Sequence, residues 1–256
     1  MNDRRISPNP DWVTQLEPGQ ITLPVVDLCA SAKGPRDRQL LLGDDVTALG
    51  QQGDFTYLRA EKDGYHGFVP SSALQAQSAP THRVQALAPH SHDKPDFKSA
   101  DRHHLSFGTR LTALSETEKF IETAHGFVPK QHLADIAQSE GDPVAIAMMF
   151  LGTPYLWGGN SCLGIDCSGL VQAALLACGV PCPGDSDLQF ADLGTPLAEG
   201  SAKKAGDLLF WKGHVAMLAD PDTLIHANAH HMATRLEGLE AAMHRITDPF
   251  LGHIRP

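Results

Sequence analysis

The 256-residue sequence predicts an α+β C-terminal domain that follows two small all-β units. Three observations support this fold class. Two short motifs each occur twice in the first half, the composition changes near residue 139, and a helical pattern there gives way to three short apolar runs. The predicted boundaries are residues 1–78 for an N-terminal segment with the first β unit, 79–138 for the second, and 139–256 for the α+β domain.

The first half contains an internal repeat. Residues 43–49 read GDDVTAL and residues 108–114 read GTRLTAL, while residues 67–74 read GFVPSSAL and residues 126–133 read GFVPKQHL. Such self-similarity is the mark of a duplicated structural unit. Short alternating segments, such as residues 55–58, are broken by glycine and aspartate, which is typical of small antiparallel strands joined by tight turns.

Two helices are predicted in the α+β domain. Asp142 as N-cap and Pro143 at the first helical position open a helix that runs to Phe150. A glycine-rich loop then leads to Asp166 and Cys167, where a second helix with regularly spaced apolar residues begins. The second helix therefore presents a cysteine in its first turn.

Three strands are predicted after these helices. The apolar runs at residues 207–211, 214–218 and 223–227 are separated by a glycine and by an Asp-Pro-Asp turn. A helix followed by such an antiparallel meander is an α+β arrangement.

Composition excludes several functions and favours a compartment. Lys plus Arg number 20 and Asp plus Glu number 30, so the net charge of −10 offers no basic surface for nucleic acid. No apolar run approaches the roughly 20 residues that span a bilayer. The first residues lack the apolar stretch of a secretion signal, and five cysteines, an odd number, fit reduced thiols. We expect a cytoplasmic protein that needs no cofactor; the oligomeric state stays open.

The second helix carries the strongest candidate for chemistry. A cysteine thiol with a pKa near ~8.5 must lose its proton to attack an amide, and a helix N-terminus or a nearby imidazole lowers that pKa. Cys167 could have both, since His214 begins the second predicted strand and His226 lies on the next one. Cysteines and histidines at such places are more often packing residues, and the chain has 14 histidines. Local chemistry alone does not decide between a catalytic set and packing residues.

A series of motifs resembles the NlpC/P60 family of cell-wall peptidases. The series comprises GTPYLWGG at residues 152–159, DCSGL at 166–170, GDLLFW at 206–211 and His214-Val215. The resemblance covers about residues 142–256 and implies a papain-like core, in which a helix bearing the nucleophile packs on an antiparallel sheet. The two N-terminal repeats resemble bacterial SH3 (SH3b) domains, small SH3-like barrels in which GFVP stands near the last strand.

The resemblance assigns roles by position. Cys167 corresponds to the nucleophile, His214 to the general base and His226 to the polar residue that orients the base. Tyr155 corresponds to a tyrosine that helps the Cys167 amide hold the oxyanion, a role that suits a neutral phenol donor.

A substrate-binding set follows from the subgroup with SH3b domains. It comprises Tyr65, Trp157, Asp166, Ser168, Asp185 and Ser186. Asp185 and Tyr65 are expected at a free N-terminal amine, and the serines at the α-carboxylate of γ-linked D-Glu. Asp166 is equally a candidate helix cap. Many relatives have arginine where this sequence has Gly184, which leaves the binding of that carboxylate open.

The implied activity is hydrolysis of the γ-D-glutamyl bond to a diamino acid, meso-diaminopimelate or Lys, in murein peptides. Without a signal, the expected substrate is a short recycled peptide, such as a murein tripeptide, with a free N-terminal L-Ala. The alternatives are a secreted hydrolase of intact wall, a non-catalytic murein-binding protein, and acyl or amide transfer. No metal is expected, because the pairs His103-His104 and His230-His231 have no Cys or carboxylate at the spacing of a structural zinc site.

Overall fold

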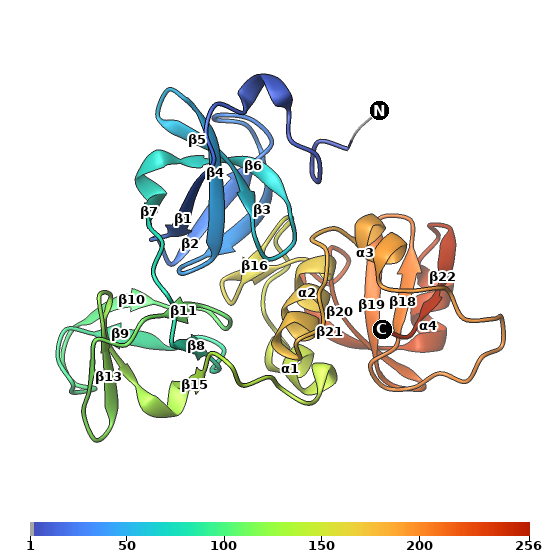
Figure 1. Ribbon diagram of the computed structural model, residues 1–256. Helices are drawn as coiled ribbons and strands as arrows, with labels where there is room; N and C mark the ends of the chain where they lie inside the picture. The colour runs from blue at the N-terminus through green and yellow to red at the C-terminus, as the bar shows by residue number, and fades with distance from the viewer. Residues whose placement is uncertain (1–2) are drawn as a thin grey trace. The chain divides into compact units, whose positions relative to one another are not determined.

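The computed structural model describes residues 3–256 and divides the chain into two compact units, residues 1–138 and 139–256 (Figure 1). The first is built from strands and the second combines helices with a sheet. The predicted α+β class is confirmed. Among the described residues, no helix is long and apolar enough to cross a membrane.

The first half of the N-terminal unit is one antiparallel sheet with the strand order β3-β2-β6-β5-β4-β1-β7. Its strands are β1 Glu17–Ile21, β2 Val25–Cys29, β3 Arg36–Leu41, β4 Asp45–Gln52, β5 Phe55–Ala60, β6 His66–Pro70 and β7 Leu74–Ala76. Leu28, Leu58 and Val69 are fully buried and form its core with other apolar side chains. Alternation along each strand directs these residues inward.

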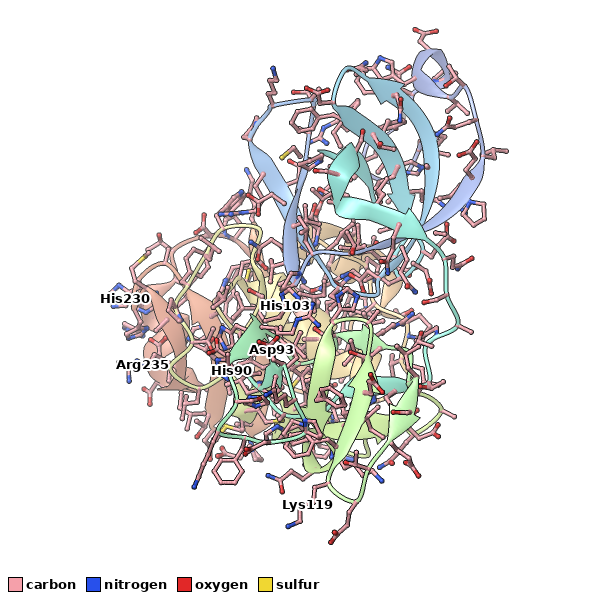
Figure 2. The ribbon with its side chains drawn as sticks, turned by 90° about the vertical axis from the view of Figure 1, so that its left-hand side faces the viewer. His90, Asp93, His103, Lys119, His230 and Arg235 are labelled. Carbon is pink, nitrogen blue, oxygen red and sulfur yellow. The ribbon has the colours of Figure 1, made fainter. Side chains whose placement is uncertain are left out.

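Two smaller sheets follow, with the orders β11-β8-β15 and β10-β9-β14-β13-β12. The strands are β8 His82–Val84, β9 His90–His92, β10 Asp101–His104, β11 Arg110–Leu111, β12 Ser115–Glu116, β13 Phe120–Thr123, β14 Gly126–Pro129 and β15 Leu133–Asp135. Figure 2 labels His90, Asp93 and His103 on the β9–β10 hairpin. Both GFVP copies fold alike: each ends a strand, continues into a short 3-10 helix and then enters a new strand.

The C-terminal unit packs helices against a five-stranded antiparallel sheet with the order β21-β20-β19-β18-β22 (Figure 1). The helices are α1 Pro143–Met149, α2 Cys167–Ala177, α3 Ser186–Asp192 and α4 Leu239–Arg245. The sheet strands are β18 Leu208–Trp211, β19 His214–Asp220, β20 Thr223–Asn228, β21 Ala233–Gly238 and β22 Phe250–Ile254, and a small hairpin pairs β16 Asn160–Ser161 with β17 Gly164–Ile165. Helix α2 contacts both β19 and β20.

Helix caps and apolar runs explain what the sequence predicts correctly here. Asp142 accepts a hydrogen bond from the Val144 amide at the start of α1, and α2 begins at Cys167 as expected. The three predicted strands correspond to β18, β19 and β20. Helix α4 and strands β21 and β22 were not predicted from the sequence.

The last strand is attached to the sheet by a buried carboxylate. The two side-chain oxygens of Asp207, a residue that is 1% exposed, lie 2.6 Å from His253 Nε2 and 2.7 Å from Arg255 Nε. Because a buried carboxylate needs such partners, Asp207 holds β22 against β18 and closes this side of the sheet.

Candidate active site

A buried aspartate organises the start of α2. Oδ1 of Asp166 accepts hydrogen bonds from the Gly169 amide at 2.6 Å and from Ser168 Oγ at 3.1 Å. Its other oxygen, Oδ2, accepts a bond from the Gly158 amide at 2.9 Å. The carboxylate therefore caps the helix and also ties the glycine-rich loop to the first turn.

The glycines allow this loop to lie directly on the helix. Gly158 has a φ of 69°, a conformation that other residues rarely adopt. A Cβ on Gly169 would lie 2.5 Å from the carbonyl oxygen of Gly159, so a side chain there would push the loop away. The glycines that flank the predicted nucleophile thus serve close backbone packing.

Asp166→Ala should destabilise the protein by about 2–3 kcal/mol, because the helix loses its cap and two buried amides lose their acceptor. Chemical denaturation of the purified variant measures this change. Asp142→Ala is the matched control, since it removes an exposed cap that accepts one amide bond, and it should cost only about 1 kcal/mol. Equal effects at the two positions would contradict the tethering role of Asp166.

Cys167 lies in the first turn of α2 and is 8% exposed. Its thiol lies against the beginning of β19, since the Val215 amide donates a hydrogen bond to it. Burial, with a further contribution from Asp166, raises the pKa of the thiol to about 12, against the lowering effect of the amides of Val215, Ser168 and Cys167. The expectation of a lowered thiol pKa is wrong for this state, because removing the sulfur from water outweighs the helix N-terminus.

Two histidines and a glutamate form a continuous hydrogen-bonded line across three strands. His214 Nε2 lies 3.0 Å from His226 Nδ1, and His226 Nε2 lies 2.9 Å from Glu237 Oε2. Glu237 is bound in turn by Arg245 of α4, with Nε 2.8 Å from Oε1 and Nη2 2.6 Å from Oε2. The line starts at β19, beside the residue whose amide contacts the Cys167 thiol, and it ends on α4.

Burial keeps both imidazoles neutral. It lowers the pKa of His214 to about 3 and that of His226 to about 4, and Arg245 lowers both further, while Glu237 raises both. With the thiol pKa raised, the resting site holds a protonated thiol and an uncharged imidazole at neutral pH. A base in this form can accept the thiol proton as attack begins.

Tyr155 lies close to the same thiol. Its amide donates a hydrogen bond to the Met232 carbonyl oxygen at 3.0 Å, and it forms a bridge with Ile165, directly before the helix cap. Burial and the neighbouring Cys167 raise the pKa of its phenol. The phenol therefore stays protonated, as a hydrogen-bond donor near the sulfur must.

The start of α3 is held beside the start of α2. Gln189 is fully buried, and its Nε2 donates to the carbonyl oxygens of Ser168 at 2.9 Å and Pro183 at 3.0 Å. Asp185 and Ser186 open α3, one turn before Gln189. The structure thus brings the segment with Asp185 and Ser186 to the first turn of the cysteine helix.

The other predicted binding residues lie in different surroundings. Ser168 is buried and donates its hydroxyl to Asp166, which acts as the cap described above. Trp157 is 69% exposed, in the loop before α2. Tyr65 belongs to the N-terminal unit, where it is buried in the core formed by Leu28, Leu58 and Val69. Substrate binding by these four residues stays a prediction.

One group of side chains has its ligating atoms close enough together to hold a metal ion. His226, His231 and Glu237 each bring a ligating atom within 4.8 Å of the others. Two of the three already form the line described above, and Arg245 places a positive charge on the same carboxylate. His230 and Arg235, labelled in Figure 2, are exposed on the neighbouring β20–β21 connection and on β21. These side chains therefore suit the hydrogen-bonded line better than they suit a bound cation.

Sequence reasoning missed Glu237, Arg245 and Gln189. Glu237 lies on β21, diagonal to His226, which pairs with Arg235. Residues displaced by two positions on adjacent strands lie within reach of long side chains. An alternating Arg-x-Glu segment after the His226 strand was the available signal, but the partner strand had to be recognised first.

Comparison with known proteins gives matches for both units. Residues 152–245 match the NlpC/P60 family, and residues 28–74 match the bacterial dipeptidyl-peptidase SH3 domain. Gamma-D-glutamyl-L-lysine dipeptidyl-peptidase of Bacillus subtilis is 29% identical over 220 residues, which cover 74% of this chain and 71% of that protein. Dipeptidyl-peptidase 6 of Lysinibacillus sphaericus is 41% identical over 87 residues, covering 33% of this chain and 31% of that protein.

A solved structure shares the fold. The crystal structure of an NlpC/P60 family protein from Bacillus cereus aligns with a TM-score of 0.79 at 22% identity. The alignment covers 94% of this chain and 100% of that one.

Proposed function

We propose that this chain, a cysteine peptidase with an NlpC/P60 domain at residues 152–245 and a bacterial SH3 domain at residues 28–74, hydrolyses the γ-D-glutamyl bond to a diamino acid in short murein peptides. The observation that carries the chemistry is the line of His214, His226 and Glu237, which starts next to Val215, the residue whose amide contacts the Cys167 thiol. The substrate class rests on the relatives named gamma-D-glutamyl-L-lysine dipeptidyl-peptidase.

The first half of the reaction forms an acyl-enzyme. Cys167 Sγ attacks the γ-carbonyl carbon of D-Glu while His214 accepts the thiol proton, so that no free thiolate has to exist in the buried site. The developing oxyanion receives hydrogen bonds from the Cys167 amide at the start of α2 and from the Tyr155 phenol. The C–N bond then breaks, and His214 returns the proton to the amine of the leaving diamino acid.

The second half releases the acyl group. A water molecule gives a proton to His214 and attacks the thioester carbon, and the same two donors stabilise the second oxyanion. The C–S bond breaks and the Cys167 sulfur regains the proton. The products are a dipeptide ending in D-Glu and a free diamino acid. His226 acts throughout as the residue that orients His214.

The start of α3 is proposed to select the peptide. A free α-amine carries a positive charge, which the Asp185 carboxylate can bind, and the hydroxyl donor of Ser186 suits the α-carboxylate of D-Glu. The hydroxyl of Ser168 donates to Asp166 and would have to release that bond to join Ser186. The Gln189 bridge that holds α3 against the Ser168 carbonyl supports this placement. A role for Tyr65 at the same amine stays a prediction of the sequence resemblance.

Incubation with L-Ala-γ-D-Glu-meso-diaminopimelate, and with the peptide ending in Lys, tests the proposal. Mass analysis should find L-Ala-D-Glu and the free diamino acid. The α-linked isomer of the same peptide is the matched control and should stay intact. Cleavage of intact murein without cleavage of either tripeptide would favour a wall hydrolase instead, and binding without cleavage would favour the non-catalytic alternative.

Acetylating the N-terminal amine should lower kcat/KM by about 100-fold or more, because the amine loses its charge and the carboxylate that binds it loses its partner. Parallel assays of the free and acetylated peptides measure the preference. In Asp185→Asn the preference should fall to about tenfold or less, mainly through slower cleavage of the free peptide.

Asp192→Asn is the matched control for this prediction, because Asp192 is an exposed residue at the other end of α3. It should keep the wild-type preference. A Tyr65→Phe variant tests the role of that residue by the same ratio. Equal cleavage of the two peptides by the wild-type protein would show that the site does not select a free amine.

We also propose that the protein acts in the cytoplasm, in recycling of murein peptides. The chain has five cysteines, an odd number, which fits the reduced thiols of such a compartment. Titration of freshly isolated, denatured protein under non-reducing conditions, together with cell fractionation, tests this location. Finding two or four protected thiols in a secreted fraction would favour an oxidising location.

A further inference from the structure

The line that begins at His214 does not end at the second histidine. His226 is 1% exposed, and its side chain contacts His214 through Nδ1 and Glu237 through Nε2. Glu237 in turn accepts two hydrogen bonds from Arg245, one on each oxygen. A buried base-orienting residue is therefore itself oriented by a charged pair from β21 and α4.

The direction of every proton in this line follows from its last member. The two hydrogen bonds from Arg245 and the contact with His226 hold the pKa of Glu237 down at about 2 although burial opposes this, so the carboxylate is ionised and only accepts. His226 must then carry its proton on Nε2, and its neutral ring presents a bare Nδ1 to His214. His214 consequently donates from Nε2, which leaves its Nδ1 without a proton.

We propose that Glu237 is a positioning residue that fixes the tautomers of both histidines, so that Nδ1 of His214 is the atom that accepts the Cys167 proton. This inference rests on the proposed thiol mechanism and extends it by one residue. With the opposite tautomers, His214 would carry a proton on Nδ1 and could not act as a base toward the thiol. Arg245 keeps the carboxylate in place and ionised.

The charges around the line give the proposal a pH signature. Besides the two histidines themselves, the titratable or charged groups that act on the line are Glu237 on β21, Arg245 on α4 and His231 after β20. The charge of Glu237 raises the pKa of His214, and that of Arg245 lowers it. Removing the carboxylate should therefore move the acid limb of kcat/KM to lower pH, and removing the guanidinium should move it to higher pH.

The direct test is the protonation pattern of the ring nitrogens in the wild-type protein. Long-range 1H–15N correlation spectra of 15N-histidine-labelled protein at neutral pH should show His226 with a proton on Nε2 and a bare Nδ1, and His214 with a bare Nδ1. This readout needs neither a substrate nor a variant, so it separates failure of this inference from failure of the proposed function. A bare Nε2 on His226 would overturn the inference.

Kinetics of Glu237→Gln provide the second test. The amide of glutamine has one acceptor oxygen, whereas both oxygens of Glu237 accept hydrogen bonds. The change should therefore let His226 and His214 populate both tautomers. We expect kcat to fall by about 10- to 100-fold, as is usual when a residue that orients a catalytic group is lost, and KM to change less than about threefold. Glu237→Asp keeps the carboxylate and should recover part of the loss. Glu240→Gln is the matched control, because Glu240 is exposed at the start of α4, and it should behave like the wild type.

The direction of the pH limbs distinguishes positioning from mere structural support. Glu237→Gln and Arg245→Gln should shift the acid limb in opposite directions, whereas a purely structural loss would lower activity with both limbs unmoved. The proposal would be overturned if the acid limb of kcat/KM stayed in place in both variants. It would also be overturned if Glu237→Gln kept the kcat and the histidine tautomers of the wild type.

Discussion

Cys167→Ala is expected to lower kcat on the tripeptide by at least about 10⁴-fold, since the proposed acyl-enzyme forms on the sulfur that this change removes. Binding should survive, because the proposed contacts to the amine and the carboxylate come from Asp185 and Ser186 at the start of α3. The variant should also keep its fold, since alanine suits a helix and removes only one sulfur from the first turn. Turnover by mass analysis and binding by calorimetry measure the two effects separately.

Cys178→Ala is the matched control, because Cys178 caps the other end of the same helix. It should retain activity within about threefold, since substitutions away from the reacting groups change transition-state binding little. Measurable turnover in a folded Cys167→Ala protein would contradict the thiol mechanism, whichever peptide is used.

His214→Ala should cause a loss about as large as that of Cys167→Ala, because nucleophile and base act as a unit. In the buried site, where burial has raised the thiol pKa to about 12, attack depends on a base that takes the proton. His226→Ala should cost roughly 100-fold less than His214→Ala, because water can replace part of an orienting contact. Steady-state kinetics on the tripeptide rank the three variants.

His244→Ala controls for the loss of an imidazole in the same domain, since His244 is exposed on α4 beside Arg245. It should leave kcat within about twofold. Equal losses in His214→Ala and His226→Ala would remove the distinction between a base and the residue that orients it.

Local signals explain why the cysteine helix could be predicted from sequence. Aspartate is among the residues most favoured as an N-cap, and here Asp166 does cap α2 at Cys167. The motifs around it predicted the peptidase domain that the family comparison then matched. His214 and His226 were predicted as neighbours on adjacent strands. In the antiparallel register of β19 and β20, His226 lies diagonal to His214, within reach of the 3.0 Å contact between their rings.

Tertiary effects explain what the sequence did not predict. Glu237 and Arg245 come from β21 and α4, elements with weak patterns of their own, and they meet only when α4 folds back on the sheet. The thiol pKa was predicted in the wrong direction because a helix N-terminus is visible in sequence, while the burial that outweighs it depends on how α2 packs against β19 and β20.

Trapping the acyl-enzyme tests the central role of Cys167 most directly. L-Ala-γ-D-Glu-p-nitroanilide replaces the diamino acid with a better leaving group, so acylation should outrun hydrolysis and give a burst of p-nitroaniline. After acid quenching, peptide mapping should locate the L-Ala-γ-D-glutamyl group on Cys167, and Cys167→Ala should give neither burst nor adduct. An adduct on another residue, or steady release of p-nitroaniline by Cys167→Ala, would contradict the mechanism.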